Sequence, residues 1–182
     1  MRARQTCPEP GRRALPGLWL LSDARNDAAL EEALRRLPRG SGFVFRHYHL
    51  PARERRARFA ALARVARGKG HLVVFAGDAA TARHWGADGT YGEPQQRLGL
   101  LCLKTAHSLR ELAAANRAGA DAVLLSPVFP TRSHRGAAAL GPLRFRLVAA
   151  RAAMPVIALG GMNVSTARRL GWPRWAAIDG LS

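Results

Sequence analysis

The chain has few lysines, few acidic residues and few cysteines, and each shortage narrows what the protein can be. Of its 182 residues, 12 are Asp or Glu and 29 are Lys or Arg, but only Lys69 and Lys104 are lysine, so the formal net charge is +17. A charge this large is typical of surfaces that bind polyanions. An Ala- and Arg-rich, Lys-poor composition is also what codon bias in a G+C-rich genome produces, and we interpret the charge mainly in that way.

The cysteines and the apolar runs exclude several other classes of protein. Cys7 and Cys102 are too few for a disulfide framework or a metal cluster and agree with a reducing, cytoplasmic location. No apolar run is long enough to span a membrane, and Pro16 interrupts the first apolar stretch before it reaches the length of a signal-peptide core. We therefore expect neither secretion nor a membrane partner.

What the sequence does have is a regular alternation of apolar runs and helical segments. Residues 1–16 contain three prolines and four arginines and are predicted to be a flexible basic arm, which leaves residues 17–182 as one domain. The 48% of hydrophobic residues is enough to bury a core. The predicted strands are Leu18–Leu21, Phe43–His47, Leu72–Phe75, Asp88–Tyr91, Leu100–Leu103, Ala122–Leu125, Val156–Leu159 and Trp175–Ile178.

Helical periodicity fills most of the intervals between these strands. Ser108 with Glu111 is predicted to form a capping box, and Gly119 to end the same helix. The predicted helices are Ala28–Leu37, Pro51–Arg67, Ala79–Trp85, Ser108–Ala118, Leu143–Ala150 and Val164–Leu170.

This alternation predicts a parallel sheet closed into an abbreviated (β/α)₈ TIM barrel. Parallel neighbours need crossover connections, and eight strands suit a closed barrel better than an open, doubly wound sheet, which is the alternative. The chain is short for a barrel. Too few residues separate Tyr91 from Leu100 for a helix between the fourth and fifth strands, and only four follow Ile178, so we expect the last helix to be missing as well.

The second half of the chain carries the most specific motifs. Residues 118–134 run from an apolar strand into the loop Ser126-Pro-Val-Phe-Pro-Thr131, and residues 155–162 end in Gly160-Gly161-Met162. Together with residues 140–142 and 176–181, they resemble the thiamine phosphate synthase/TenI family. The resemblance extends over residues 18–181 but is sparse before residue 105. It implies a barrel that joins a pyrimidine methyl diphosphate to a thiazole phosphate, releasing pyrophosphate with the help of Mg²⁺.

The glycine pair predicts where the thiazole phosphate binds. Gly160 and Gly161 directly follow an apolar strand and allow backbone N–H groups to approach an anion. The next helix, capped by Asn163 or Ser165, points its positive N-terminal end at the same place. Barrels commonly share a phosphate between the loops after the seventh and eighth strands. The backbone of Ile178, Asp179 and Gly180 is therefore predicted to supply the other half.

A second group of residues is predicted to hold the diphosphate. Arg46 ends the second strand, where the family carries an Arg-x-Lys pair, and its guanidinium matches phosphate geometry, but Tyr48 replaces the lysine. The resemblance places Thr131 on a diphosphate oxygen. Ser133 adds a hydroxyl, and His134 stands where the family has a lysine, which replaces a fixed charge with a titratable one.

The fifth strand ends in two further candidates. Thr105 and His107 stand where the family has a Ser or Thr and a His. His107 is interpreted as a general acid/base or a hydrogen-bonding partner of the substrate, the alternative being that it only caps the helix that follows.

The predicted metal site departs most from the family pattern. Synthases present an Asn-Asp pair after the third strand and another Asp after the fourth, because Mg²⁺ prefers carboxylate oxygens. Here Ala76-Gly77 occupies the first position, so Asp78 and Glu93 are the available carboxylates. One interpretation is that these two carboxylates form a substituted magnesium site. The alternatives are that the metal arrives with the diphosphate or that no metal binds, and that Asp78 only caps the next helix.

Three functions agree with these residues. The first is a divergent thiamine phosphate synthase, acting on phosphorylated pyrimidine and thiazole substrates, with a homodimer as a possible assembly. The second keeps the phosphate pocket without the coupling reaction, as a thiazole tautomerase that uses His107 or as a non-catalytic binder of thiamine precursors. The third is a basic interaction module for nucleic acid or an acidic partner, which no stacking platform, zinc spacing or helix-turn-helix pattern supports.

Overall fold

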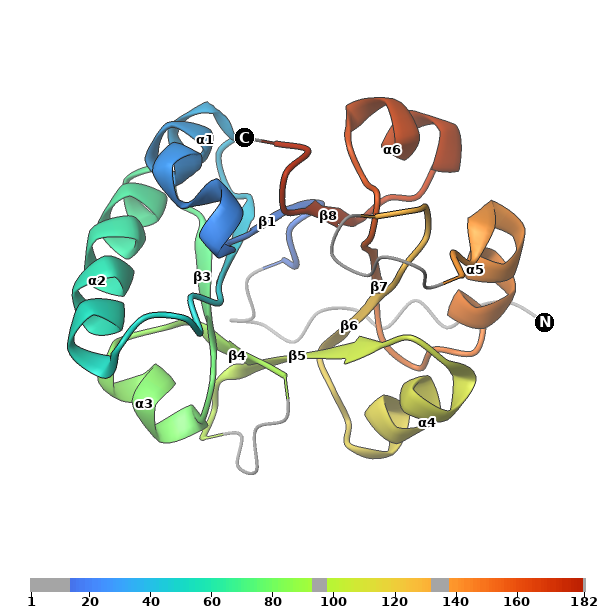
Figure 1. The fold of residues 1–182 in the computed structure, drawn as a ribbon. Coiled ribbons are helices and arrows are strands. Elements are labelled where there is room, and N and C mark those ends of the chain that lie inside the picture. Colours follow the sequence, from blue (N-terminus) through green and yellow to red (C-terminus); the bar gives the residue numbers. More distant parts are fainter. Residues whose placement is uncertain (1–13, 93–97, 132–137, 182) are drawn as a thin grey trace.

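The strands close into a barrel in the order in which they occur in the chain. The computed structural model describes residues 14–92, 98–131 and 138–181. All neighbouring strands are parallel, and the last one pairs with the first. Figure 1 shows the strands at the centre and the helices around them. The strands are β1 (Leu18–Leu21), β2 (Gly42–Phe45), β3 (Leu72–Ala76), β4 (Gly89–Tyr91), β5 (Leu101–Ala106), β6 (Ala122–Leu125), β7 (Val156–Ala158) and β8 (Trp175–Ala177).

Each described helix covers the outside of the barrel after the strand that precedes it. No helix is described between β4 and β5, where residues 93–97 lie outside the described part of the chain, and none is described after β8 up to residue 181. None of the described helices is long and apolar enough to cross a bilayer. The helical elements are η1 (Ala24–Ala29), α1 (Leu30–Arg36), α2 (Ala52–Gly68), α3 (Ala79–His84), α4 (Leu109–Arg117), α5 (Gly141–Ala149) and α6 (Val164–Leu170).

The prediction of a closed (β/α)₈ barrel is confirmed, and the ends of several helices are those that the sequence predicts. Asn163 caps α6 by accepting a hydrogen bond from the Thr166 N–H. Ser108 caps α4, but its capping box is incomplete, because the Glu111 carboxylate binds the backbone N–H of His107 and not that of Ser108. The first predicted helix divides into the 3₁₀ turn η1 and the α-helix α1.

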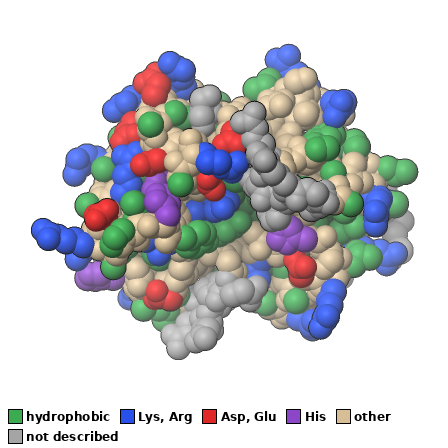
Figure 2. Space-filling model, viewed as in Figure 1, with side chains coloured by type: hydrophobic (Ala, Val, Ile, Leu, Met, Phe, Trp, Pro, Cys, Tyr) green, Lys and Arg blue, Asp and Glu red, His purple; other side chains and the backbone are tan. Residues whose placement is uncertain are grey.

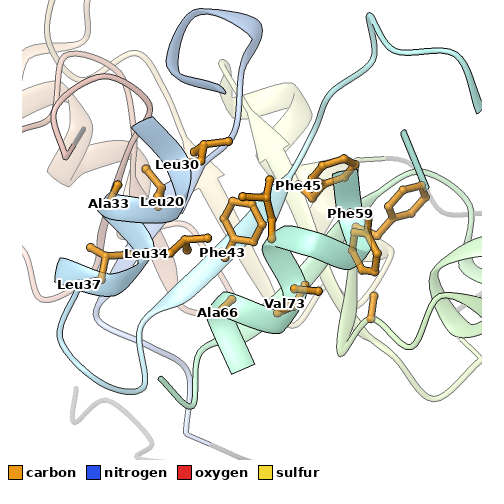
Figure 3. Close-up of a cluster of buried hydrophobic side chains, with 14 of the residues drawn as sticks. Leu20, Leu30, Ala33, Leu34, Leu37, Phe43, Phe45, Phe59, Ala66 and Val73 are labelled. Carbon is orange, nitrogen blue, oxygen red and sulfur yellow. The ribbon is translucent and has the colours of Figure 1, made fainter. Parts of the chain in front are cut away.

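The hydrophobic core is divided between the inside of the barrel and the layer beneath the helices. Trp19, Leu21, Val44, Val74 and their neighbours fill the interior. Outside β1–β3, Phe43 and Phe45 pack against α1 and α2, with Leu34 and Phe59 among the helix residues of the cluster that Figure 3 shows. The end of the predicted N-terminal arm belongs to this fold: Leu15 packs against the barrel interior, and the Pro16 carbonyl accepts a hydrogen bond from the Trp19 indole at 2.9 Å.

Candidate functional site

A cavity of about 590 Å³ opens where the strands end at their carboxyl termini. The ends of all strands except β3 contribute to its lining. The carboxyl ends of the strands are where barrels of this architecture carry their chemistry. The lining residues are Asp23, Arg25, Arg46, Tyr48, Tyr91, Thr105, His107, Ser126, Thr131, Leu159, Gly160, Gly161, Met162, Ala177, Ile178, Asp179 and Gly180.

This one cavity brings together most of the residues that the sequence singles out. Two predicted residues, Ser133 and His134, lie outside the described part of the chain, as does the predicted metal ligand Glu93. Asp78 is described but does not line the cavity. The predicted residues found in the lining are Arg46, Thr105, His107, Thr131, Gly160, Gly161, Ile178 and Asp179.

The glycine turn after β7 owes its shape to the loop after β6. Gly160 and Gly161 have φ angles of +90° and +62°, a region that side chains rarely adopt. A Cβ on Gly161 would lie 2.5 Å from the Pro130 carbonyl oxygen, so a side chain there would push the two loops apart. The Gly160 carbonyl also accepts a hydrogen bond from the Phe129 N–H at 3.1 Å. The two motifs of the second half therefore form one packed unit beside the cavity.

The end of β8 meets that turn, as the phosphate-site prediction requires. A Cβ on Gly180 would lie 2.3 Å from the Met162 carbonyl oxygen, so the two backbones are in direct contact. Asn26, which is 4% exposed, anchors this end of β8 from η1. Its amide donates to the carbonyls of Leu21 at 3.1 Å and Ile178 at 2.8 Å, and its side-chain oxygen accepts from the Asp23 N–H at 2.8 Å. One side chain thus ties β8 to β1.

We expect Asn26→Leu to destabilise the fold by about 3 kcal/mol, because it leaves three backbone groups in or near the core without their partner. Urea unfolding measures the change. Asn116→Leu is the matched control: this asparagine also bridges two backbone groups, Arg151 O and the Ala153 N–H, but at the surface, where water replaces it. Equal losses in the two variants would contradict the anchoring role of Asn26.

A chain of alternating charges runs along the wall of the cavity. Asp23 accepts from the Arg25 Nε at 2.8 Å and lies 3.5 Å from an Arg46 guanidinium nitrogen, and Arg25 reaches Asp179 at 3.3 Å. Burial works to raise the pKa of Asp23, but the hydrogen bonds from Arg25 and the charges of Arg25 and Arg46 outweigh it and hold the pKa below its ordinary value. The carboxylate is therefore ionised, and both guanidinium groups are held at the cavity.

The backbone of Arg46 is fixed by a buried chain of hydrogen bonds. The Arg46 N–H donates to Ser22 Oγ at 2.7 Å, Ser22 Oγ lies 2.8 Å from His47 Nδ1, and His47 Nε2 lies 2.7 Å from Asp27 Oδ1. Because the ionised Asp27 only accepts, His47 carries its proton on Nε2, and Ser22 donates to Nδ1. Arg58 donates to the same Asp27 oxygen at 2.7 Å. Ser22 is fully buried, so this Ser–His–Asp arrangement positions Arg46 and does not expose a nucleophile.

We expect the fold to lose stability as the pH falls below about 6.5, because two histidines are buried in the neutral form. Burial lowers the pKa of His47, against the pull of Asp27, and lowers the pKa of His71, against its hydrogen bond to the Leu34 carbonyl. The unfolded chain therefore takes up protons first as the pH falls through the ordinary histidine value of 6.5.

Urea unfolding at pH 7.5 and pH 5 measures this loss, and His71→Gln is expected to reduce it. Equal free energies of unfolding at the two pH values would contradict the burial of neutral histidines.

His107 stands in the cavity wall with its orientation set by an acidic neighbour. Glu111 Oε2 accepts from the His107 backbone N–H at 2.9 Å and lies 3.0 Å from its Nδ1. Burial works to raise the pKa of Glu111, but these hydrogen bonds and that from Ser108 hold it below its ordinary value. An ionised Glu111 places the neutral imidazole's proton on Nδ1, which makes Nε2 the nitrogen that accepts a proton. Nearby in the lining, burial raises the pKa of Tyr91 to about 12, so its phenol stays protonated.

The described residues do not fit a magnesium ion. The carboxylate of Asp78 caps α3 by accepting from the Thr81 N–H at 2.7 Å, which is the alternative that the sequence left open. The two carboxylates that line the cavity, Asp23 and Asp179, both pair with arginine. Among the described residues there is no group of three His, Cys, Asp or Glu side chains that would hold a metal.

Comparisons with known proteins agree with the fold and with the motifs. A family model described as thiamine monophosphate synthase matches residues 93–178. The solved structure of thiamine phosphate pyrophosphorylase from Pyrococcus furiosus is 25% identical, with a TM-score of 0.71 over 88% of this chain and 84% of that one. The chain is thus similar to the thiamine phosphate synthase/TenI family in its second half by sequence and over most of its length by fold.

Curated relatives show the same similarity over shorter stretches. A putative thiamine-phosphate synthase 2 of Aquifex aeolicus is 41% identical over 59 residues, which is 32% of each chain. The thiamine-phosphate synthase of Methanospirillum hungatei is 38% identical over 76 residues, or 41% of this chain and 35% of the relative. The chain thus spans about a third of the length of the curated relatives it matches. A citrate synthase structure, 10% identical with a TM-score of 0.58 over 91% of this chain and 87% of that one, shares the fold alone.

Several cavity residues had no predicted role. Asp23, Tyr91 and Ser126 stand at or just after strand ends, and a rule that every polar residue in that position faces the mouth of a barrel would have found them. Asn26, which lies in η1, has no comparable signal. Asn26 acts on Ile178, 152 residues away, and that contact exists only once the barrel closes.

Proposed function

We propose that the protein acts in thiamine biosynthesis and joins hydroxymethylpyrimidine diphosphate to thiazole phosphate, releasing pyrophosphate. The observation that carries this proposal is that the turn at Gly160 and Gly161, the end of β8 and the side chain of Arg46 line the same cavity. The cavity lining offers backbone groups for a phosphate and a guanidinium for a diphosphate.

The reaction asks little covalent chemistry of the protein. The bond between the pyrimidine methylene carbon and the diphosphate oxygen breaks, and its electron pair leaves with pyrophosphate. The electron-rich aminopyrimidine stabilises the resulting cation, and the lone pair of the thiazole nitrogen forms the new carbon–nitrogen bond. No proton has to be removed to balance these steps. The cavity contributes alignment of the two substrates and stabilisation of the leaving diphosphate by Arg46 and the hydroxyl of Thr131.

The test is to incubate the purified protein with both substrates and to follow thiamine phosphate and pyrophosphate by mass spectrometry and ³¹P NMR. We expect the two products in equal amounts. Absence of both products, with and without added Mg²⁺, would contradict the proposal.

The pairing of His107 with Glu111 favours a second candidate, a thiazole tautomerase. An imidazole whose Nδ1 is bound to a carboxylate is arranged to accept and return a proton at Nε2. This function predicts isomerisation of a thiazole carboxylate phosphate without any pyrimidine substrate, and its loss in His107→Ala. The coupling reaction, in contrast, involves no proton transfer and needs no acid or base at His107.

A further inference from the structure

The end of β3 carries a guanidinium where the family pattern has carboxylates. Arg55, from the first turns of α2, donates to the Ala76 carbonyl at 2.6 Å and to the Arg46 carbonyl at 3.3 Å, so it joins the ends of β2 and β3. Its guanidinium carbon lies 4.6 Å from the ring centre of Phe75 and 5.3 Å from that of Tyr48, which lines the cavity. A fixed positive charge in this place repels a divalent cation and attracts an anion.

Two arginines here are incompletely satisfied. The Nε atoms of Arg46 and Arg55 are both buried, and neither has a hydrogen-bond partner among the described residues. The side chain of Arg46 is 22% exposed and stands in the cavity wall, and its ion pair with Asp23 is long at 3.5 Å. Buried donors without acceptors are costly, and the side chain of Arg46 lines the cavity, so the cavity suits an anionic ligand that pairs with the Arg46 guanidinium.

From these contacts we propose that the cavity binds a diphosphate without a divalent cation, with Arg46 contacting the anion and Arg55 supplying a fixed charge behind it. This inference rests on the proposed function for the identity of the ligand. Arg46 is the binding residue, and Arg55 is a positioning residue that acts through the backbone of Arg46, the ring of Tyr48 and its own field. In the described part of the chain, arginine then takes the place of the metal.

Calorimetry with inorganic pyrophosphate tests the proposal, in buffer with EDTA and in buffer with Mg²⁺, at a fixed 150 mM salt. We expect dissociation constants that agree within about twofold in the two buffers, because the binding charge belongs to the protein. Pyrophosphate that binds only with Mg²⁺, or about tenfold more tightly with it, would overturn the proposal.

Substitutions separate the two arginines from the general effect of a +17 chain. We expect Arg46→Gln and Arg55→Met each to weaken pyrophosphate binding in EDTA about tenfold. Arg53→Met removes the same charge from an exposed position on the same helix and is expected to change binding less than about twofold. Arg55→Met that binds as tightly as Arg53→Met would overturn the role of Arg55.

Two further comparisons keep the outcome decisive. Arg55→Lys keeps the charge and is expected to bind pyrophosphate more tightly than Arg55→Met. Circular dichroism shows whether Arg55→Met folds. If it does not fold, equal pyrophosphate binding by Arg55→Lys and Arg55→Gln would overturn the proposal instead. Binding of pyrophosphate in EDTA without any coupling activity would leave this inference standing and refute the proposed function. Coupling activity together with pyrophosphate binding that requires Mg²⁺ would support the proposed function and refute this inference.

Discussion

Replacing Arg46 with glutamine is expected to lower kcat/KM of the coupling reaction about a hundredfold. Removing one electrostatic contact to a group that gains charge in the transition state typically costs a factor of this size. Arg46 faces the cavity, and its main chain is held by Ser22 and, through Ser22, by His47 and Asp27, so the guanidinium is preorganised where the diphosphate leaves. Steady-state kinetics with the pyrimidine diphosphate as the varied substrate measures the effect.

The control for this experiment is Arg56→Gln, which removes one charge from an exposed position on α2. It is expected to leave kcat/KM within about twofold of the parent protein. If Arg56→Gln and Arg46→Gln lose activity equally, the effect comes from net charge and not from the position of Arg46. A loss in Arg46→Gln that appears only in KM would indicate that Arg46 binds the diphosphate without stabilising its departure.

Gly161→Ala is expected to weaken binding of thiazole phosphate at least tenfold. The new Cβ would meet the Pro130 carbonyl oxygen at 2.5 Å and the Phe129 Cβ at 2.8 Å, so the turn after β7 must move away from the loop after β6. The backbone N–H groups that are predicted to hold the phosphate move with it. Calorimetry with thiazole phosphate measures the loss.

Gly171→Ala separates the clash from the cost of the backbone conformation. Gly171 has nearly the same φ angle, +60°, at the end of α6, but the nearest atom to its Cβ position is an Arg146 guanidinium nitrogen at 3.6 Å, and the residue does not line the cavity. Both variants are expected to lose about 1 kcal/mol of stability from the left-handed conformation. Only Gly161→Ala is expected to lose thiazole phosphate binding, and equal binding by the two variants would contradict the role of the turn.

The sequence was sufficient to predict the barrel and most of its candidate site, for a physical reason. Strands such as β1 and β6 are short apolar runs bounded by turn residues, and helices such as α6 have a recognisable cap, so each element is specified locally. Once the strands are parallel and closed into a barrel, all their carboxyl ends meet at one mouth. Arg46, His107 and Gly160 therefore share a cavity although they are far apart in the chain.

The contacts that support the site could not be predicted in the same way. The sequence assigns no role to Arg55 and Arg58, because charged residues near the start of a helix usually face solvent. In the structure Arg55 stacks on Phe75 and bonds the end of β3, and Arg58 binds both Asp27 and Glu31. These partners lie on other elements, and no local pattern distinguishes a stacked arginine from a solvated one.

The net charge of +17 needs no separate binding function in this account. On the face shown in Figure 2, most Lys and Arg side chains lie near the rim, over the helices, and a smaller group of basic and acidic side chains lies near the centre. At the cavity, part of the positive charge is paired with carboxylates, which hold the arginine side chains in place. These ion pairs join Asp23, Arg25, Arg46 and Asp179.

The most direct test of the account is an NMR titration of the ¹⁵N-labelled protein with thiazole phosphate. The proposed phosphate site requires the backbone after β7 and the backbone after β8 to bind the same phosphate. We therefore predict saturable shifts, with a common dissociation constant, of the amide resonances of Gly160, Gly161, Asp179 and Gly180. Shifts confined to one of these two segments, or found only at exposed arginines and lost at modest salt, would contradict it.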